Sequence, residues 1–159
     1  MAVAGLLAQY MSIKSQLSYV ELQDTRWNDL ATAMSKKLSE QENYQSKWED
    51  NSGKVDDVWD RESTTFTYKG ETYWDGGKYQ TAGSDRSQKY KREEACTKYA
   101  FAKVPKYNPD KLDEYTDLDM EYSTMVAMYD TLLEELQAQA DGIKTQLSTE
   151  AQDNHMLGQ

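Results

Sequence analysis

The fold of this chain is decided by residues 6–48, which read LLAQYMSIKSQLSYVELQDTRWNDLATAMSKKLSEQENYQSKW. Alternate steps of four and three residues from Leu6 reach thirteen positions, of which ten are apolar. This heptad spacing is the one with which a helix packs along a partner helix. The repeat contains no proline, so it predicts one helix from about residue 4 to about residue 50, ended by Asn51, Ser52 and Gly53. The thirteen positions are Leu6, Tyr10, Ile13, Leu17, Val20, Asp24, Trp27, Ala31, Met34, Leu38, Gln41, Gln45 and Trp48.

Residues 107–115, YNPDKLDEY, predict the start of a second helix. Asn108 suits the N-cap, Pro109 suits the first helical position, and Asp110 suits the positive end of the helix dipole. The apolar pattern that follows predicts a helix to the end of the chain, interrupted only by a tolerated Gly142. Its pattern positions are Tyr115, Leu118, Tyr122, Met125, Tyr129, Leu132, Leu136 and Ile143.

A second apolar row lies beside this pattern and repeats every seven residues, at Val126, Leu133, Ala140 and Leu147. The apolar face of the second helix is therefore wider than one partner helix requires, and we expect a further neighbour. We call the heptad positions of the first helix and the two rows of the second helix the seam. The seam residues expected to mediate assembly are Leu6, Tyr10, Ile13, Leu17, Val20, Trp27, Met34, Leu38, Leu118, Tyr122, Met125, Tyr129, Leu132, Leu136, Ile143 and Leu147.

The middle segment, residues 54–107, differs from the flanking helices. STTFTY, ETYW and KYQTA are rich in threonine and aromatic residues, and KG and DGG separate them. They predict two or three short antiparallel strands joined by tight turns. A short helix at about residues 86–102 should follow. The fold class is thus mainly α, a long antiparallel helical hairpin with a small antiparallel β insertion at the turn. The paired helices are assigned to residues 1–53 and 108–159, and the insertion to residues 54–107.

The insertion carries the aromatic stretch TFTYKGETYWDGGKY, residues 65–79. Such aromatics could form a miniature core, a contact between copies of the protein, or a platform for sugars. Packing is favoured, because aromatic residues at strand spacing usually pack, here against Trp59, Tyr99, Phe101 or a neighbouring copy. The residues concerned are Phe66, Tyr68, Tyr73, Trp74 and Tyr79.

Composition and charge limit the function. The 159 residues are 38% hydrophobic and 29% charged, with a mean hydropathy of −0.94, which favours elongated helices over a large compact core. The net charge is −10, and it resides in residues 110–159, whereas residues 51–109 are slightly basic. This charge argues against nucleic acid or an anionic membrane as a partner.

No sequence signal points to secretion through a cleaved leader, to a membrane span or to a disulfide. The start lacks a basic region followed by a long apolar run, and no window approaches the roughly 18 apolar residues of a membrane span. Cys96 is the only cysteine. Export that leaves the N-terminus intact remains open, and otherwise the protein is expected in the cytoplasm or in a virion.

Catalytic motifs are absent from the sequence. His155 is the only histidine, so the usual zinc sites and histidine-based nucleophile pairs cannot be built. The acidic run at residues 110–122 places Asp113, Asp117 and Glu121 on one helix face, but it lacks the glycine and the spacing of a calcium loop. A solvated acidic face is the favoured interpretation. We therefore expect no enzymatic activity, no metal site, no cofactor and no small-molecule ligand.

The layout, two terminal heptad helices around a β-rich insert, resembles that of flagellins and of the needle and filament subunits of type III secretion systems. The resemblance implies terminal helices that line the filament interior, subunits that stack helically and an insert that faces outward. It implies polymer contacts along Leu6 to Leu38 and along Leu118 to Leu147, and an outer segment at residues 54–107.

We therefore expect a structural protein that self-assembles with other copies of the chain, as an extracellular filament or appendage subunit. Two other classes of function remain open. One is a helical interaction module, such as an export chaperone or a phage-particle adaptor, whose seam receives another protein's helix. The other is a glycan-binding tip carried on a coiled-coil stalk.

Overall fold

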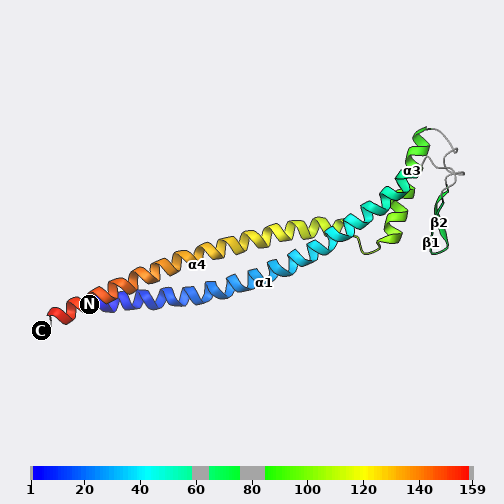
Figure 1. Cartoon of the computed structure of the whole chain (residues 1–159). Coiled ribbons are helices and arrows are strands. Elements are labelled where there is room, and N and C mark those ends of the chain that lie inside the picture. The colour runs from blue at the N-terminus through cyan, green and yellow to red at the C-terminus, as the bar shows by residue number, and fades with distance from the viewer. Residues whose placement is uncertain (1, 59–64, 76–84, 158–159) are drawn as a thin grey trace. The chain divides into compact units, whose positions relative to one another are not determined.

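The structure, a computed structural model, describes residues 2–58, 65–75 and 85–157. In chain order the elements are α1 (Ala2–Asp57), β1 (Thr65–Tyr68), β2 (Glu71–Asp75), α3 (Asp85–Lys103) and α4 (Pro109–Leu157), shown in Figure 1. The predicted fold class is confirmed: the chain is mainly helical, with a long helical hairpin and a small antiparallel sheet between its helices.

The chain forms two compact units. Unit 1 consists of residues 1–35 and 117–159, and unit 2 consists of residues 36–116. Both long helices contribute to both units, because α1 and α4 each cross a boundary. Each unit is described below by itself.

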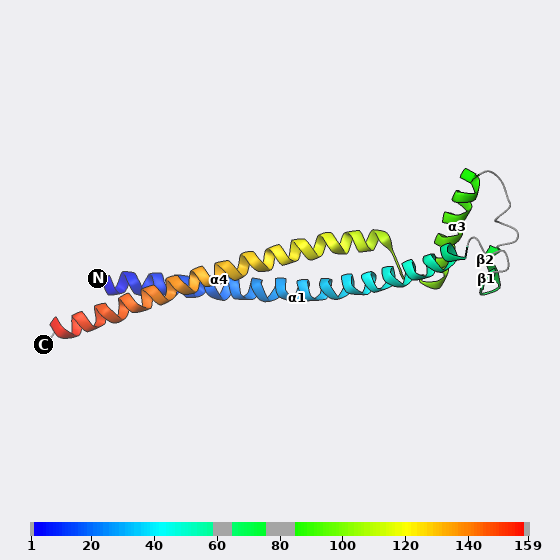
Figure 2. The same ribbon diagram turned by 45° about the horizontal axis from the view of Figure 1, so that its top comes forward.

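Unit 1 is an antiparallel pair of helices. Its parts of α1 and α4 run side by side in both views, with the amino end of α1 and the carboxyl end of α4 at the same end (Figure 1, Figure 2). Leu17 packs with Leu136, and Trp27 contacts Tyr122 with ring centroids 5.7 Å apart. Residue numbers therefore rise along α1 as they fall along α4, as a hairpin requires.

Helix α1 is longer than predicted. The expected stop at Asn51, Ser52 and Gly53 is wrong, because the helix continues to Asp57. Asn51 does not cap the helix; its side-chain amide donates to the carbonyl of Lys47 one turn earlier, at 2.8 Å. The extra turn places Val55, which is fully buried, in the core of unit 2. The packing of Val55 thus outweighs the weak local preference of Asn51, Ser52 and Gly53 for ending a helix.

The start of α4 follows the predicted capping. Oδ1 of Asn108 accepts hydrogen bonds from the backbone amides of Asp110 and Lys111, at 3.1 and 3.2 Å. Pro109 is the first helical residue. These bonds satisfy two of the amides that a helix start leaves without partners in the helix.

The two strands pair in antiparallel fashion through a two-residue turn at Lys69 and Gly70. Both residues have positive φ angles, 52° and 82°, which identifies the turn type that matches the twist of a hairpin. The predicted KG turn is therefore present. The possible third strand, KYQTA, and the aromatics Trp59 and Tyr79 lie outside the described residues.

A break in the strand register decides where the aromatic side chains point. Phe66 pairs with Trp74, whereas Thr67 pairs with Thr72, so Tyr73 is an extra residue in β2. Successive side chains of a regular strand point to opposite faces, but a bulge redirects one of them. Trp74 and its neighbour Tyr73 consequently both reach the same core of unit 2.

Candidate functional site

The predicted seam occupies the less exposed face of each long helix. All thirteen heptad positions of α1 are buried or half-buried, and so are all the pattern positions of α4. Four of the predicted assembly residues are buried, namely Leu17, Val20, Met34 and Leu136. The other twelve are half-buried: Leu6, Tyr10, Ile13, Trp27, Leu38, Leu118, Tyr122, Met125, Tyr129, Leu132, Ile143 and Leu147.

The best-packed part of the seam lies in the middle of unit 1. Leu17 and Val20 of α1 form a buried cluster with Leu136 and Ala140 of α4. The partly buried side chains of Tyr10, Ile13, Tyr129, Leu132 and Leu133 pack against this cluster. At least part of the seam is therefore used within the chain.

The second apolar row of α4 has a simple explanation in this unit. Leu133 and Ala140 belong to the same cluster as Leu136, and Ala140 is only 2% exposed, whereas Gln139 is exposed. A helix with 3.6 residues per turn drifts by about 20° per heptad relative to a strict seven-residue repeat. Over several turns the contact moves from one row to the next, so one partner helix uses both rows here.

Large apolar side chains also lie on the outer faces of unit 1, away from the seam. The most exposed of them on α1 are Leu7, Met11, Tyr19, Leu22 and Leu30. On α4 they are Met120 and Met128. The sequence pattern did not single them out, because they fall between the heptad positions.

The aromatic insertion is a packed core in unit 2. Trp74 is fully buried, and it shares a cluster with Val55, Ala95, Cys96 and Tyr99. Tyr99 is the centre of the ring contacts, with centroids 5.0 Å from Phe66 and 5.9 Å from Tyr73. Tyr68 is half-buried, with the ammonium group of Lys103 4.6 Å from its ring centroid. The buried ring of Trp74 offers no face on which a sugar could stack.

A second aromatic cluster in unit 2 was not foreseen from the sequence. Trp48 contacts Phe101 and Tyr107, with centroids 5.4 and 5.7 Å apart, and Phe101 stacks on Tyr107. Phe101 packs in this cluster, whereas the ring that contacts Phe66 and Tyr73 of the β insertion is Tyr99, another of the partners proposed from the sequence. The heptad position of Trp48 was the available signal, but its partners come from the loop and helix that precede α4.

Gln41 joins α1 to that loop. It is a buried polar residue at a seam position, and its side-chain amide donates to the carbonyl of Lys106 at 3.2 Å. Its Oε1 accepts from the backbone amide of Asn108 at 3.0 Å. One side chain thus satisfies two backbone groups next to the start of α4, which explains a polar residue in an apolar row.

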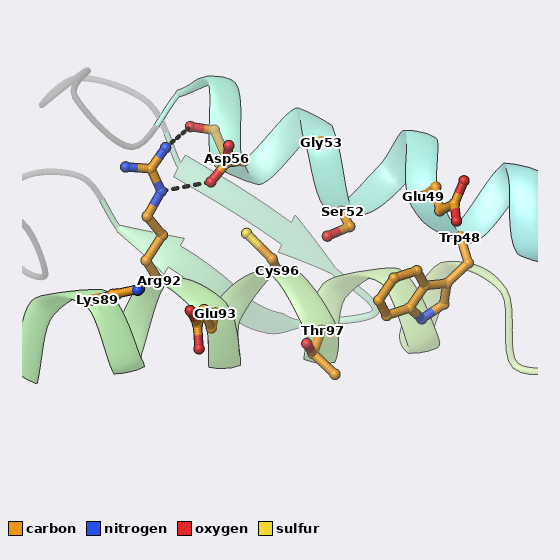
Figure 3. Close-up of a pocket in the computed structure, with 10 residues that line it drawn as sticks. All are labelled: Trp48, Glu49, Ser52, Gly53, Asp56, Lys89, Arg92, Glu93, Cys96 and Thr97. Carbon is orange, nitrogen blue, oxygen red and sulfur yellow. Dashed lines mark hydrogen bonds and ion pairs between the residues drawn. The ribbon is translucent and has the colours of Figure 1, made fainter. Parts of the chain in front are cut away.

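A groove of about 650 Å³ lies between the end of α1 and α3 (Figure 3). Nε of Arg92 on α3 donates to Oδ1 of Asp56 on α1 at 2.6 Å, and its terminal amino group donates to the Asp56 carbonyl at 3.2 Å. Cys96 lines the groove near Ser52. Burial, and then the charge of Asp56, raise the pKa of the Cys96 thiol despite the opposing effect of Arg92. The thiol is therefore held protonated, which is a poor state for a nucleophile.

The described part of the chain contains no candidate metal site and no candidate membrane-spanning helix. Residues 2–58, 65–75 and 85–157 hold no group of three or more side chains that could bind a metal ion. In the same ranges, no helix combines the length and the apolar character needed to span a membrane. The side chain of His155 lies outside the described residues.

Comparison of the chain with protein-family models, with curated proteins and with solved structures finds no significant match.

Proposed function

We propose that this chain is a non-enzymatic structural subunit that assembles with copies of itself through the helices of unit 1, as part of an extracellular filament or appendage. The described residues contribute no feature that calls for an enzyme, and two of the polar side chains that bridge elements of unit 2 have structural partners. Gln41 holds a loop, and Arg92 joins α3 to α1.

The observation that carries the proposal is the incomplete burial of unit 1. Its two helices bury few side chains completely, and most of the apolar seam remains half-exposed. Large apolar side chains such as Met11, which is 64% exposed, lie outside the seam as well. Burying apolar surface contributes about 25 cal/mol per Å², so association of several copies would recover free energy that one hairpin leaves unused.

A repeating contact is the natural outcome for a helix pair with apolar residues on more than one face. Closed dimers use one surface twice, whereas contacts between two different surfaces form rings or filaments. Unit 1 has apolar residues on outer faces of both helices, in addition to the seam. This distribution favours a polymer over a simple dimer.

Sedimentation velocity over a hundredfold range of concentration, combined with negative-stain microscopy, tests the proposal. We expect species that grow with concentration and are seen as filaments or rings. A monomer that persists over the whole range would contradict self-assembly. A dimer that stops growing would favour the interaction module, whose seam receives a helix of another protein.

A further inference from the structure

Unit 1 has an open groove along one side of its helix pair. It consists of two adjoining hollows, of about 410 and 490 Å³, that share Gln139 in their walls. Its floor is apolar, and Gln9, Gln16, Gln139 and Gln146 line its sides, seven residues apart on each helix. We call it the glutamine-lined groove.

One charged side chain, Glu135, lines this groove among the described residues. The groove is therefore nearly neutral, although residues 110–159 carry twelve acidic side chains. Gly142 lines the groove, and the space beside it is open, because a Cβ added at this position would meet nothing within 4 Å. An occupant should thus be an uncharged helix face that presents a single basic group.

The outer face of α1 has this composition. Leu7, Met11, Lys14, Ser18 and Leu22 are spaced by four, three, four and four residues, so a straight helix places them in one row. All five are exposed. Lys14 is the only charged residue among the first twenty. We call this set the outer row, and none of its members lines the glutamine-lined groove.

The two surfaces match in length and in charge. The outer row spans sixteen residues of α1 from Leu7 to Leu22, or roughly 22 Å, and the groove extends along α4 from Leu132 to Gln146, or roughly 21 Å. Neither Lys14 nor Glu135 forms an ion pair within the part of the chain that the structure describes. Each therefore has an opposite charge available on the other surface.

We propose that the outer row of one copy lies in the glutamine-lined groove of the next copy, with Lys14 paired to Glu135 of that neighbour. The proposal rests on the proposed function and specifies its interface. Because the two surfaces are different parts of unit 1, every copy can use both of them, and the contact continues from copy to copy. The apolar members of the row provide the buried area, and the charge pair selects the register.

Charge exchange tests the pairing. Lys14→Glu and Glu135→Lys should each raise the concentration needed for assembly by about fivefold, because each places like charges in the interface. The double variant should assemble as the unchanged protein does, and an equimolar mixture of the two single variants should form mixed assemblies. Both side chains are exposed, so circular dichroism should show unchanged folding in all variants.

A matched pair of methionines tests the apolar part. Met11 and Met120 are 64% and 66% exposed, but Met11 lies in the outer row and Met120 lies on α4 outside the groove. Met11→Glu should raise the assembly concentration at least tenfold, whereas Met120→Glu should have a clearly smaller effect, because Met120 lies outside this interface.

The outcomes separate the two proposals. If the unchanged protein stays monomeric, the proposed function fails and this interface fails with it. If it assembles but Met11→Glu has no larger effect than Met120→Glu, only the interface is wrong. If the single charge variants weaken assembly and the double variant does not restore it, the pairing of Lys14 with Glu135 is wrong.

Discussion

The carboxyl groups of Asp24 on α1 and Asp130 on α4 face each other across the helix pair of unit 1, within hydrogen-bonding reach. Oδ1 of Asp24 is buried and accepts no hydrogen bond from the described residues. Two carboxyl groups can share a hydrogen bond only when one of them holds a proton. An acidic residue at a seam position therefore makes the helix pair sensitive to pH.

Acidification should stabilise unit 1. Burial is the main cause that raises the pKa of Asp24, followed by the hydrogen bond and the negative charge of Asp130. Because the pKa is higher in the folded chain, folding takes up a proton as the pH falls. The resulting stabilisation is complete below the unfolded pKa of about 3.9, and it is lost as the pH rises through the raised folded value.

Asp24→Asn should remove most of this pH dependence, because an amide does not titrate and can donate to Asp130 at any pH. At pH 7 we expect the variant to be more stable by about 1 kcal/mol. Thermal unfolding between pH 4 and pH 8 measures both effects. Asp29→Asn is the control, since Asp29 is an exposed residue of the same helix. Equal gains in both variants would show that general charge repulsion, and not the carboxyl pair, is responsible.

Trp74→Ala should destabilise unit 2 by about 3 to 5 kcal/mol, because it empties the centre of a core in which Trp74 is fully buried. Denaturant unfolding measures the lost free energy of unfolding, and hydrogen exchange of the α3 amides shows whether the loss falls on unit 2. Tyr90→Ala, at a position that is 67% exposed, should change stability by less than about 0.5 kcal/mol. A stable Trp74→Ala variant that loses binding on a glycan array would instead support the glycan-binding alternative.

Gln41→Met should cost about 2 kcal/mol, because it removes two hydrogen bonds and leaves the carbonyl of Lys106 and the amide of Asn108 without this partner. Hydrogen exchange should show faster opening at the first turn of α4. Asn43→Ala, two residues away on an exposed position, provides the comparison. Unchanged exchange at Asn108 in the Gln41→Met variant would contradict the bracing role of this side chain.

Gly70→Ala should weaken the β hairpin by about 1 kcal/mol, because its φ of 82° lies in the left-handed region where a Cβ is strained. Lys69→Asn should act in the opposite direction, since asparagine tolerates the positive φ at this position better than lysine. Chemical denaturation of the two variants under identical conditions compares them. The same sign of change in both would contradict this assignment of the turn.

Much of the fold was readable from the chain. The heptads of residues 6–48 and 115–147 identified the inner faces of both long helices, because burying one stripe of a helix requires an apolar residue about every 3.5 positions. The N-cap at Asn108 and the turn at Lys69 and Gly70 were also readable, since each depends on the chemistry of one or two residues.

Contacts between distant residues were not readable. Helix α1 extends to Asp57 because Val55 packs in a core formed with β2 and α3. The residues around Val55 in the sequence carry no signal of those distant partners. The bulge at Tyr73 turned a second aromatic side chain toward Tyr99. The cluster of Trp48 with Phe101 and Tyr107 depends on how a loop returns to α1.

Periodicity and turn chemistry are local properties, so the order of residues shows which faces of the helices are apolar and where the β hairpin turns. Which surfaces remain open depends on how the helices pack. Both apolar rows of α4 pack against α1 in unit 1, whereas the outer row of α1 and the glutamine-lined groove stay uncovered. Exposure is a relation between segments far apart in the chain, so only the packed helices could reveal it.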